Sequence, residues 1–510
     1  MADPILHVSI GPVQQFVGQA RRTRDLWAGS FLLSWLAGQL MAGVMRRGGR
    51  VLFPLVGTVQ APRNPLLAAI VGGQSEQPST GTLPNRFKAS VPAAFDPEDA
   101  AEDARQAWQR LAESVWGQFV AGAAIAGRGT RAIWERQIDG FWELQWMMGA
   151  EPGDGSDGSW LDQRKNWRSH WPPCEGGDHC TAMGDWQEIS GFVRGRERHL
   201  QDAFWRNLQD KVGRLDIRDG ERLCAVALVK RLFPKLGTRS QKHAIGWPLD
   251  AANWPSTAYM AAVPWLMHVG ATAARCSKLG RYLREIEQHV GPDAFARLKG
   301  ERATRLPGLD SLGEHAGLDG NLFLEAALAN PRATPLRHLR GTGTEHLEDP
   351  DADTRERLLG SLKRLGGAVG GSAMPFYALL LMDGDRLGNL LRENDEQSVS
   401  AALARFVDRV DDTVAGRNGV TVYAGGDDVL AILPVTCAVD CAIRLRHAYD
   451  LAFQPLKLDA ASRRATASAA IVFAHYHCPL GDVLKCAHTE LDETAKEGNG
   501  RNSLALAVML

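Results

Sequence analysis

The sequence has little cysteine and no excess of charge of either sign. Eight Cys among 510 residues are too few for a disulfide scaffold. Lys and Arg number 58 against 59 Asp and Glu, and the net charge of −1 argues against a chain that grips nucleic acid by its own bulk charge. Contact through a local patch, or through basic partner subunits, stays open. No cleavable signal peptide is recognisable, so we expect a reducing, cytoplasmic location.

Long apolar runs are also scarce. One stretch, residues 26–45, has no charged residue and is nearly long enough to cross a bilayer. It is interrupted by Gly, Ser and Gln, and the sequence holds no second stretch of this kind. We therefore expect a long helix buried in a domain core, and no contact with a membrane.

What is present is the composition of a soluble globular chain, with 45% hydrophobic and 23% charged residues. The length predicts about three domains. Gly-rich, polar stretches at 153–159 and 366–371 suggest their limits. We expect a first domain at 1–155, a mostly helical middle region with many Trp at 156–365, and a last domain at 372–510.

The fold class indicated by these patterns is α+β. In the last domain we expect strands at 376–382, 420–423, 429–433, 465–473 and 504–510, with helices at 398–414, 437–453 and 480–496. This β-α-β-β-α-β order, followed by one more helix and strand, is that of a ferredoxin-like palm. The first domain shows a looser version, with strands at 5–10, 51–56, 87–91 and 141–148 and helices at 13–45 and 97–126. We therefore predict two related palms flanking the middle region.

Carboxylates gather where the strands of the last domain end. The first strand runs into Asp383, Gly384 and Asp385, and the next two strands meet at Gly425, Gly426, Asp427 and Asp428. Neighbouring strands of a palm are antiparallel, so the hairpin tip and the end of the first strand should lie side by side. Such a cluster of like charges calls for hard divalent cations such as Mg²⁺, which take oxygen ligands. The glycines permit the turn and let a phosphate approach.

Gly-Gly-Asp-Asp alone is also a common hairpin turn, because these residues favour turns. The second group of acids about forty residues earlier, at a strand end, makes the site the better interpretation. Lys496 and Arg501 precede the last strand and suit triphosphate oxygens. A basic helix C-terminus followed by a Gly stop would look the same.

With these residues in view, the last domain resembles the nucleotidyl-cyclase palm shared by the GGDEF diguanylate cyclases and the large subunit of type III CRISPR effector complexes. The ending Asp427-Asp428 points to the CRISPR branch. Five further segments resemble the type III-B version of that subunit and occur in the same order: 9–17, 20–30, 83–87, 223–234 and 475–480.

The resemblance implies a target-RNA-activated nucleotidyltransferase of antiviral defence. Other effector subunits, a guide crRNA and target RNA would be its partners, and ATP its substrate, condensed into cyclic oligoadenylate. Asp383, Asp427 and Asp428 would hold Mg²⁺ or Mn²⁺. Gly384, Asp385, Gly425, Gly426, Lys496 and Arg501 would contact the nucleotide. The first palm, which lacks a Gly-Gly-Asp-Asp turn, would not catalyse. Ring size stays open.

Two other functions remain as alternatives: a non-catalytic scaffold subunit, and a stand-alone cyclic-dinucleotide synthase that works without guide RNA. Relatives often carry an N-terminal nuclease domain marked by a His-Asp pair. None of the 14 His here is followed by Asp, so we expect no DNA cleavage. Relatives also continue past the final strand into a helical domain. Either this chain is a shortened form, which we favour, or another chain supplies the missing element.

The middle region differs from that of its relatives in the cysteines that would bind zinc. The family has two Cys-x-x-Cys pairs there, and this chain retains only the first cysteine of each, Cys180 and Cys224. Zinc needs four ligands in a closed site. Cys174 and His179 could restore the count, although adjacent residues such as His179 and Cys180 are poorly placed for joint chelation. We expect a degenerate zinc finger whose thiols are buried like small hydrophobic groups.

Overall fold

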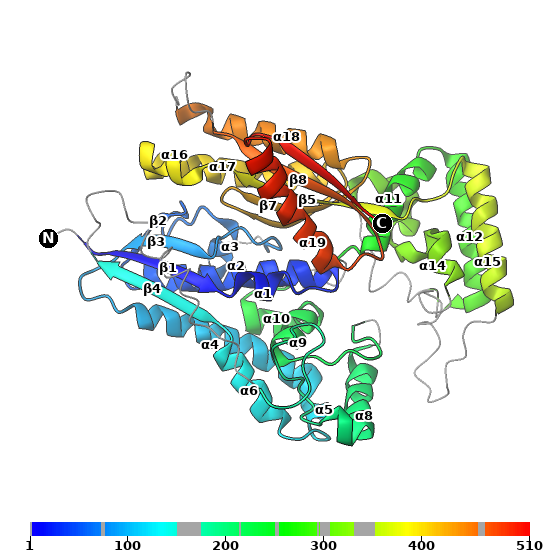
Figure 1. Cartoon of the computed structure of the whole chain (residues 1–510), viewed down its shortest axis with the longest axis horizontal. Coiled ribbons are helices and arrows are strands. Elements are labelled where there is room, and N and C mark those ends of the chain that lie inside the picture. The colour runs from blue at the N-terminus through cyan, green and yellow to red at the C-terminus, as the bar shows by residue number, and fades with distance from the viewer. Residues whose placement is uncertain are drawn as a thin grey trace.

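The computed structural model of the chain describes residues 3–72, 77–149, 175–213, 216–249, 254–292, 295, 306–330, 352–456 and 465–510. In this part of the chain the fold is mixed α+β, as predicted, with two β-sheets and a helical region between them in sequence. Figure 1 shows the second sheet and its helices above a long central helix, with further helices below.

The first sheet has four strands in the order β2-β3-β1-β4, all antiparallel. Burial alternates along β1, so Leu6, Val8 and Ile10 face the core as the period-two pattern predicted. The elements of this part are β1 (Ile5–Gly11), α1 (Val13–Val17), α2 (Thr23–Arg46), β2 (Arg50–Phe53), α3 (Pro65–Val71), β3 (Arg86–Ser90), α4 (Pro97–Val115), a π-helical turn (Trp116–Val120), α5 (Ala121–Ala124), α6 (Thr130–Gly140) and β4 (Glu143–Gly149).

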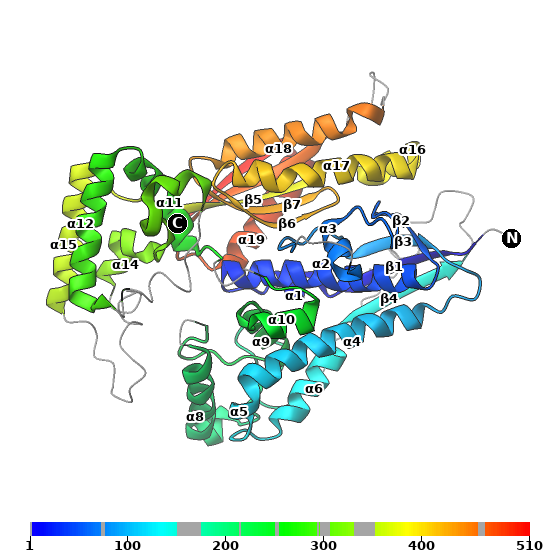
Figure 2. The same ribbon diagram turned by 180° about the vertical axis from the view of Figure 1, so that it is seen from behind.

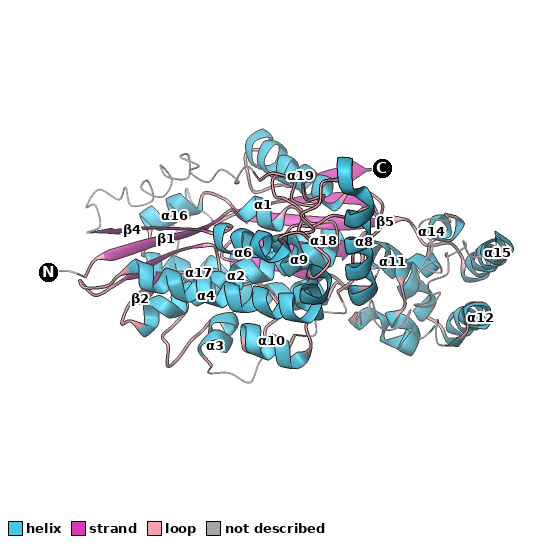
Figure 3. Cartoon of the chain, turned by 90° about the horizontal axis from the view of Figure 1, so that it is seen from below, coloured by secondary structure: helices cyan, strands magenta, loops and turns pink. Residues whose placement is uncertain are grey.

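Helices dominate the described part of the middle region. Two of them, α12 and α15, pack side by side at the end of the molecule that lies away from the N-terminus (Figure 3). The helices are α8 (Arg194–Val212), α9 (Ala225–Leu232), α10 (Thr238–Ile245), α11 (Thr257–Gly270), α12 (Ala273–Val290), α14 (Glu325–Ala329) and α15 (Ala352–Val369), with 3₁₀ turns at Phe233–Lys235, Pro307–Gly317 and Gly320–Phe323.

The second sheet has five strands in the order β6-β7-β5-β8-β9. Its central strand β5 is buried on both faces, which explains its continuous apolar sequence. Only the β8–β9 pair is parallel. The elements are β5 (Phe376–Gly384), α16 (Leu387–Glu393), α17 (Glu396–Ala415), β6 (Val420–Gly425), β7 (Asp428–Pro434), α18 (Ala438–Phe453), a 3₁₀ turn (Gln454–Leu456), β8 (Ala467–His475), α19 (Leu480–Thr489), a π-helical segment (Glu490–Gly498) and β9 (Leu504–Met509).

The two sheets share one arrangement. Numbered along the chain, the first four strands of each sheet are ordered 2-3-1-4 across it. In both, the first strand is central and lies antiparallel to the third and the fourth. This shared order agrees with the expectation of two related domains, although their sequences are only weakly alike.

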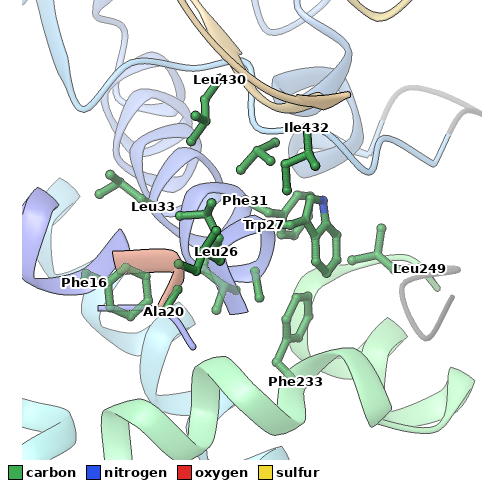
Figure 4. Close-up of a cluster of buried hydrophobic side chains, with 14 of the residues drawn as sticks. Phe16, Ala20, Leu26, Trp27, Phe31, Leu33, Phe233, Leu249, Leu430 and Ile432 are labelled. Atoms are coloured by element: carbon green, nitrogen blue, oxygen red, sulfur yellow. The ribbon is translucent and has the colours of Figure 1, made fainter. Parts of the chain in front are cut away.

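Helix α2 lies between the second sheet and the helices α4, α9 and α10 (Figure 2). It is the one described helix long and apolar enough to cross a membrane, and 94% of its most apolar window is buried inside the protein. Figure 4 shows Leu430 and Ile432 of β7 on one side of α2 and Phe233 on the other. Trp27 and Phe31 of α2 stack at 5.6 Å between them. The run therefore forms the predicted core helix.

One predicted element is wrong: the helix expected over 13–45 is two helices. The break falls between α1 and α2, where Arg22 is extended. The Lys230 ammonium, from α9, donates to the carbonyl oxygens of Phe16 and Gln19 at 2.5 and 2.7 Å. Because these carbonyls are satisfied by a distant side chain, the helix can end there at little cost.

A short loop of the first part holds the strand that leads into the Gly-Gly-Asp-Asp turn. The Ala424 amide donates to the Gly81 carbonyl at 3.0 Å, which adds a parallel bridge at the edge of β6. The indole of Trp27 donates to Ser79, and that of Trp247 donates to Pro78. We call residues 78–83 the strap. It ties the β6 edge to α2 and to the middle region.

Candidate metal and nucleotide site

The three predicted acids meet at one end of the second sheet. Asp383 is the second-last residue of β5, and Asp428 is the first residue of β7. Gly425 pairs with Asp428 across the β6–β7 ladder, so Gly426 and Asp427 form a two-residue turn. One carboxylate oxygen from each of Asp383, Asp427 and Asp428 lies within 4.8 Å of the others. Across the described residues, no other group of three or more His, Cys, Asp or Glu is gathered this closely.

Glycines make this convergence possible. Gly426 has a φ of +67°, a conformation that L side chains rarely adopt, and so allows the tight turn. Gly384 permits close packing instead. A Cβ at residue 384 would lie 2.7 Å from Cβ of Asp427 and 2.5 Å from the Tyr449 hydroxyl. The turn can therefore press against the end of β5 only because residue 384 has no side chain.

The negative charges of the three acids are not fully compensated by the residues around them. Desolvation, together with the charge of Asp383, raises the pKa of Asp427 to about 7. Desolvation and the charges of Asp427 and Asp383 also raise the pKa of Asp428 well above its usual value. The charge of Asp383 opposes ionisation of Asp427 and Asp428, and a cation would relieve that opposition. The donor set is all oxygen, which suits Mg²⁺ or Mn²⁺.

Lys496 supplies one positive charge. It lies on the π-helical segment after α19, and its ammonium pairs with Asp383 and, at 3.1 Å, with Asp492. Burial opposes its charge, but these two carboxylates outweigh burial, so the pKa of Lys496 is raised. The structure thus brings Lys496 to the acids. The predicted single helix over 480–496 becomes π-helical in its last turns, a distortion often found at functional sites.

Asp385 is buried and does not join the acids. One of its carboxylate oxygens accepts from the Ser468 hydroxyl at 2.8 Å. The other accepts from the Thr466 hydroxyl at 2.7 Å and from the Asn502 amide at 2.9 Å. Asp385 therefore links the end of β5 to the start of β8 and to the loop before β9. Its position is that of a structural carboxylate.

Arg501 lies in the same loop as Asn502, with a φ of +76°. Its amide donates to the Ala495 carbonyl at 3.2 Å, which folds the loop back on the π-helical segment that carries Lys496. The Nε of Arg501 is buried and has no hydrogen-bond partner in the described structure. Arg501 is thus the neighbour in sequence of Asn502, whose amide binds Asp385, and its Nε has no partner among the described residues.

Two tyrosines near the acids carry no signal in the sequence. Tyr449 projects from α18 toward Gly384, and Tyr423 of β6 covers Gly425, where a Cβ would lie 2.2 Å from the Tyr423 hydroxyl. Both residues sit in regular elements that read as ordinary core. Only the packing of α18 on the sheet and the pleat of β6 reveal that they face the acids.

The remnants of the predicted zinc finger also come together. Cys180 and Cys224 are both buried, and the Cys224 thiol lies 3.8 Å from the Met183 sulfur. Although burial opposes it, hydrogen bonds from Cys224 and from two backbone amides lower the pKa of Cys180. Ala227 is buried beside them. The positions of two Cys-x-x-Cys pairs therefore converge, with a thioether and a methyl in place of two thiolates.

The other two predicted zinc ligands do not support a site in what the structure describes. His179 is exposed, and its backbone pairs with Gln187. Cys174 lies outside the described residues. A zinc site here therefore stays untested.

Comparison with known families gives two matches. Residues 376–505 match the model described as Cas10/Cmr2, second palm domain. Residues 5–115 match the model described as CRISPR-associated protein Cmr2, N-terminal. The first match contains the acid group, the Gly-Gly-Asp-Asp turn and Lys496.

Relatives and solved structures agree with these matches. The chain is 32% identical over 168 residues to the CRISPR system Cmr subunit Cmr2 of Pyrococcus furiosus, a segment covering 27% of this chain and 19% of that protein. Type III-B Cmr-beta in its apo state gives a TM-score of 0.60 at 14% identity, covering 97% of this chain and 67% of that chain. The complex bound to cognate target RNA gives 0.57 at 15%, covering 97% and 68%. These last two likenesses concern the fold.

Proposed function

The chain carries two domains of the Cas10/Cmr2 family, and from this premise we propose that it is the nucleotidyl-transferring large subunit of a type III-B CRISPR effector complex. In this proposal, target RNA activates the last domain to condense ATP into cyclic oligoadenylate. The observation that carries the proposal is the group of Asp383, Asp427 and Asp428 at the edge of a domain of this family. A scaffold subunit has no need of three acids that repel one another.

The three acids would hold Mg²⁺ or Mn²⁺. Divalent cations bound there would supply activation of a 3′-hydroxyl and charge compensation for the departing pyrophosphate. Asp383 fixes one side of the group from the rigid central strand β5. The turn presents Asp427 and Asp428 from the opposite side. Gly426 of this turn has no side chain, which would leave room for a phosphate.

The cations of the chain would bind the triphosphate. The Lys496 ammonium already lies against Asp383, so it can exchange that carboxylate for a phosphate oxygen without a large movement. Arg501 has a buried Nε with no partner, which a phosphate oxygen could satisfy. Gly384, Gly425 and Gly426 would shape the site, while Asp385 would act indirectly by fixing the loop that carries Arg501.

The proposal extends to the organisation of the chain. We propose palms of the ferredoxin-like type at 1–155 and 372–510, the first without catalytic activity, with the middle region 156–365 between them. Guide crRNA, target RNA and the other effector subunits would be its partners in the cytoplasm. For Cys180 and Cys224 we propose a buried thiol pair without zinc.

The proposal is tested by replacing the turn acids. In a complex assembled with guide RNA, target RNA and labelled ATP, Asp427→Ala with Asp428→Ala should leave well under a tenth of the cyclic product, because losing the metal clamp costs several kcal/mol of transition-state stabilisation. Assembly and RNA binding should not change. The matched control is Asp408→Ala with Asp412→Ala, two exposed acids one turn apart on α17, which should retain full synthesis.

The other outcomes separate the competing functions. Normal synthesis by the Asp427/Asp428 variant would end the proposed mechanism. Product formed by the wild-type chain alone, without guide or target RNA, would indicate a stand-alone synthase. A wild-type complex that binds target RNA but makes no product would indicate a scaffold.

A further inference from the structure

We propose that Tyr449 is a positioning residue of this site, whose hydroxyl donates a hydrogen bond, directly or through one water, to the carboxylate of Asp427 and holds it in place to bind a metal. The inference rests on the proposed function. It concerns a residue on α18, outside both acidic segments and outside the Gly-Gly-Asp-Asp turn.

The hydroxyl of Tyr449 has no partner although it is fully buried. Its side chain is 0% exposed, and in the described structure no group accepts or donates a hydrogen bond at the hydroxyl. Leaving a buried hydroxyl unpaired is unfavourable, and such groups usually mark a missing water, ion or ligand. The side chain is therefore an unexplained donor at the edge of the acid group.

The direction of the hydroxyl is fixed by the aromatic ring. Phe406 of α17 meets the Tyr449 ring edge-on at 5.1 Å between centroids, and Phe453 lies against it at 4.8 Å. A ring held on two sides can flip about its own axis, but that motion leaves the hydroxyl oxygen where it is. The donor is consequently pre-organised by the core between α17 and α18.

The hydroxyl points at the site through the gap left by Gly384. The position that a Cβ would take at residue 384 is 2.5 Å from the Tyr449 hydroxyl and 2.8 Å from a carboxylate oxygen of Asp427. Both atoms therefore border the same small space, which is free because residue 384 is glycine. A rotation of the Asp427 side chain would bring its carboxylate within hydrogen-bonding distance of the hydroxyl.

The electrostatics are those of a donor. A tyrosine hydroxyl has an ordinary pKa of about 10, so it carries its proton at neutral pH and can donate. In the described structure the Asp427 carboxylate accepts from its own backbone amide, and no side chain donates to it. Partners behind a metal ligand orient it, and their loss commonly weakens metal binding by about 10–100-fold.

Metal affinity of the full chain tests the inference. Mn²⁺ titrations followed by electron paramagnetic resonance should show binding to Tyr449→Phe about tenfold weaker than to the wild type. The matched control is Tyr377→Phe. Tyr377 is also fully buried with an unpaired hydroxyl, but it lies at the opposite end of β5 from Asp383. Its variant should bind Mn²⁺ like the wild type.

A second measurement separates positioning from folding. Without metal, Tyr377→Phe should melt at or above the wild-type temperature, since it removes an unpaired buried hydroxyl, while Tyr449→Phe loses one hydrogen bond but should still fold and melt cooperatively. In the synthesis assay, excess Mn²⁺ should restore much of the activity that Tyr449→Phe loses. Equal Mn²⁺ affinity in Tyr449→Phe and wild type, an equal loss in Tyr377→Phe, or failure of Tyr449→Phe to fold would each overturn the inference alone. A wild-type chain that binds no Mn²⁺ would overturn the proposed function as well.

Discussion

Three packing requirements apply at the position that a Cβ of residue 384 would occupy. The turn must approach β5, the Asp427 carboxylate must face Asp383, and the Tyr449 hydroxyl must reach the same space. Each of these contacts lies within 2.8 Å of where a Cβ would be. Real Cβ atoms do not tolerate such distances, so any side chain here displaces the turn, α18 or both.

We therefore predict that Gly384→Ala lowers cyclic nucleotide synthesis more than tenfold. Overpacking of this kind typically also costs about 1–3 kcal/mol of folding stability. Activity of the assembled complex and thermal melting of the chain measure the two effects.

Gly388→Ala is the control for that variant. Gly388 lies four residues on, in α16, and a Cβ there would meet nothing within 4 Å. Alanine favours helix, so stability should stay level or rise by about 0.5–1 kcal/mol, with normal activity. If the two variants behave alike, close packing at residue 384 is not what the site requires.

Among the elements, strands were the most predictable. Apolar runs and the Gly-Gly-Asp-Asp turn placed β5, β6 and β7 within a few residues, and strand ends brought Asp383 beside the turn. What failed depended on distant partners. The break after α1 is stabilised by Lys230, more than two hundred residues away. The separation of Asp385 from the acids depends on Ser468 and Thr466 of the β8 segment.

The local sequence also did not reveal the different surroundings of Asp383, Asp385 and Tyr449. Asp383 and Asp385 read as one acidic pair, yet alternate residues at a strand end can still take different partners once the chain turns. Tyr449 gave no signal because its spacing on α18 is that of any core residue. Sequence periodicity predicts which face is buried, but it cannot show which buried polar atom lacks a partner.

The buried cysteines Cys180 and Cys224, the second of which precedes α9, support a prediction about zinc. Cys224 caps the N-terminus of α9 by accepting from the Ala227 amide. Protein purified without added zinc should contain far less than one zinc per chain, since two thiolates and a thioether do not complete a closed site. Elemental analysis measures this.

Cys224→Ser is the companion variant. A serine oxygen can keep the helix cap, so the free energy of unfolding should change by about 1 kcal/mol or less. One tightly held zinc in the wild type that is lost from this variant would contradict the prediction, and would implicate further ligands beyond the described residues.

For the whole molecule, α2 lies in one hydrophobic cluster that joins the first sheet to one face of the second sheet. One face of the second sheet, including Leu379, Leu430 and Ile432, shares its hydrophobic cluster with α2 and not with its own helices α17 and α18. The strap adds a backbone hydrogen bond at the β6 edge. On this face the second sheet is covered in part by its own α19 and in part by α2, which precedes it by most of the chain.

We predict that residues 372–510 produced alone are insoluble or associate, because the part of that apolar face that α2 covers and the β6 edge are then exposed. Co-production with residues 1–371 should restore a soluble complex. Soluble yield and gel filtration measure the outcome. A monomeric 372–510 fragment with a cooperative melting transition would show that the second sheet does not need α2.

The position of α2 against the second sheet also affects how the chain folds during its synthesis. A ribosome makes α2 early and β7 late, and at about 5–20 residues per second the interval between them is on the order of twenty seconds or more. During that interval the flank of α2 that will receive Leu430 and Ile432 has no sheet to cover it. The nascent chain therefore exposes an apolar surface that can associate with other chains during most of its translation. The rate of translation would then affect the yield of native protein.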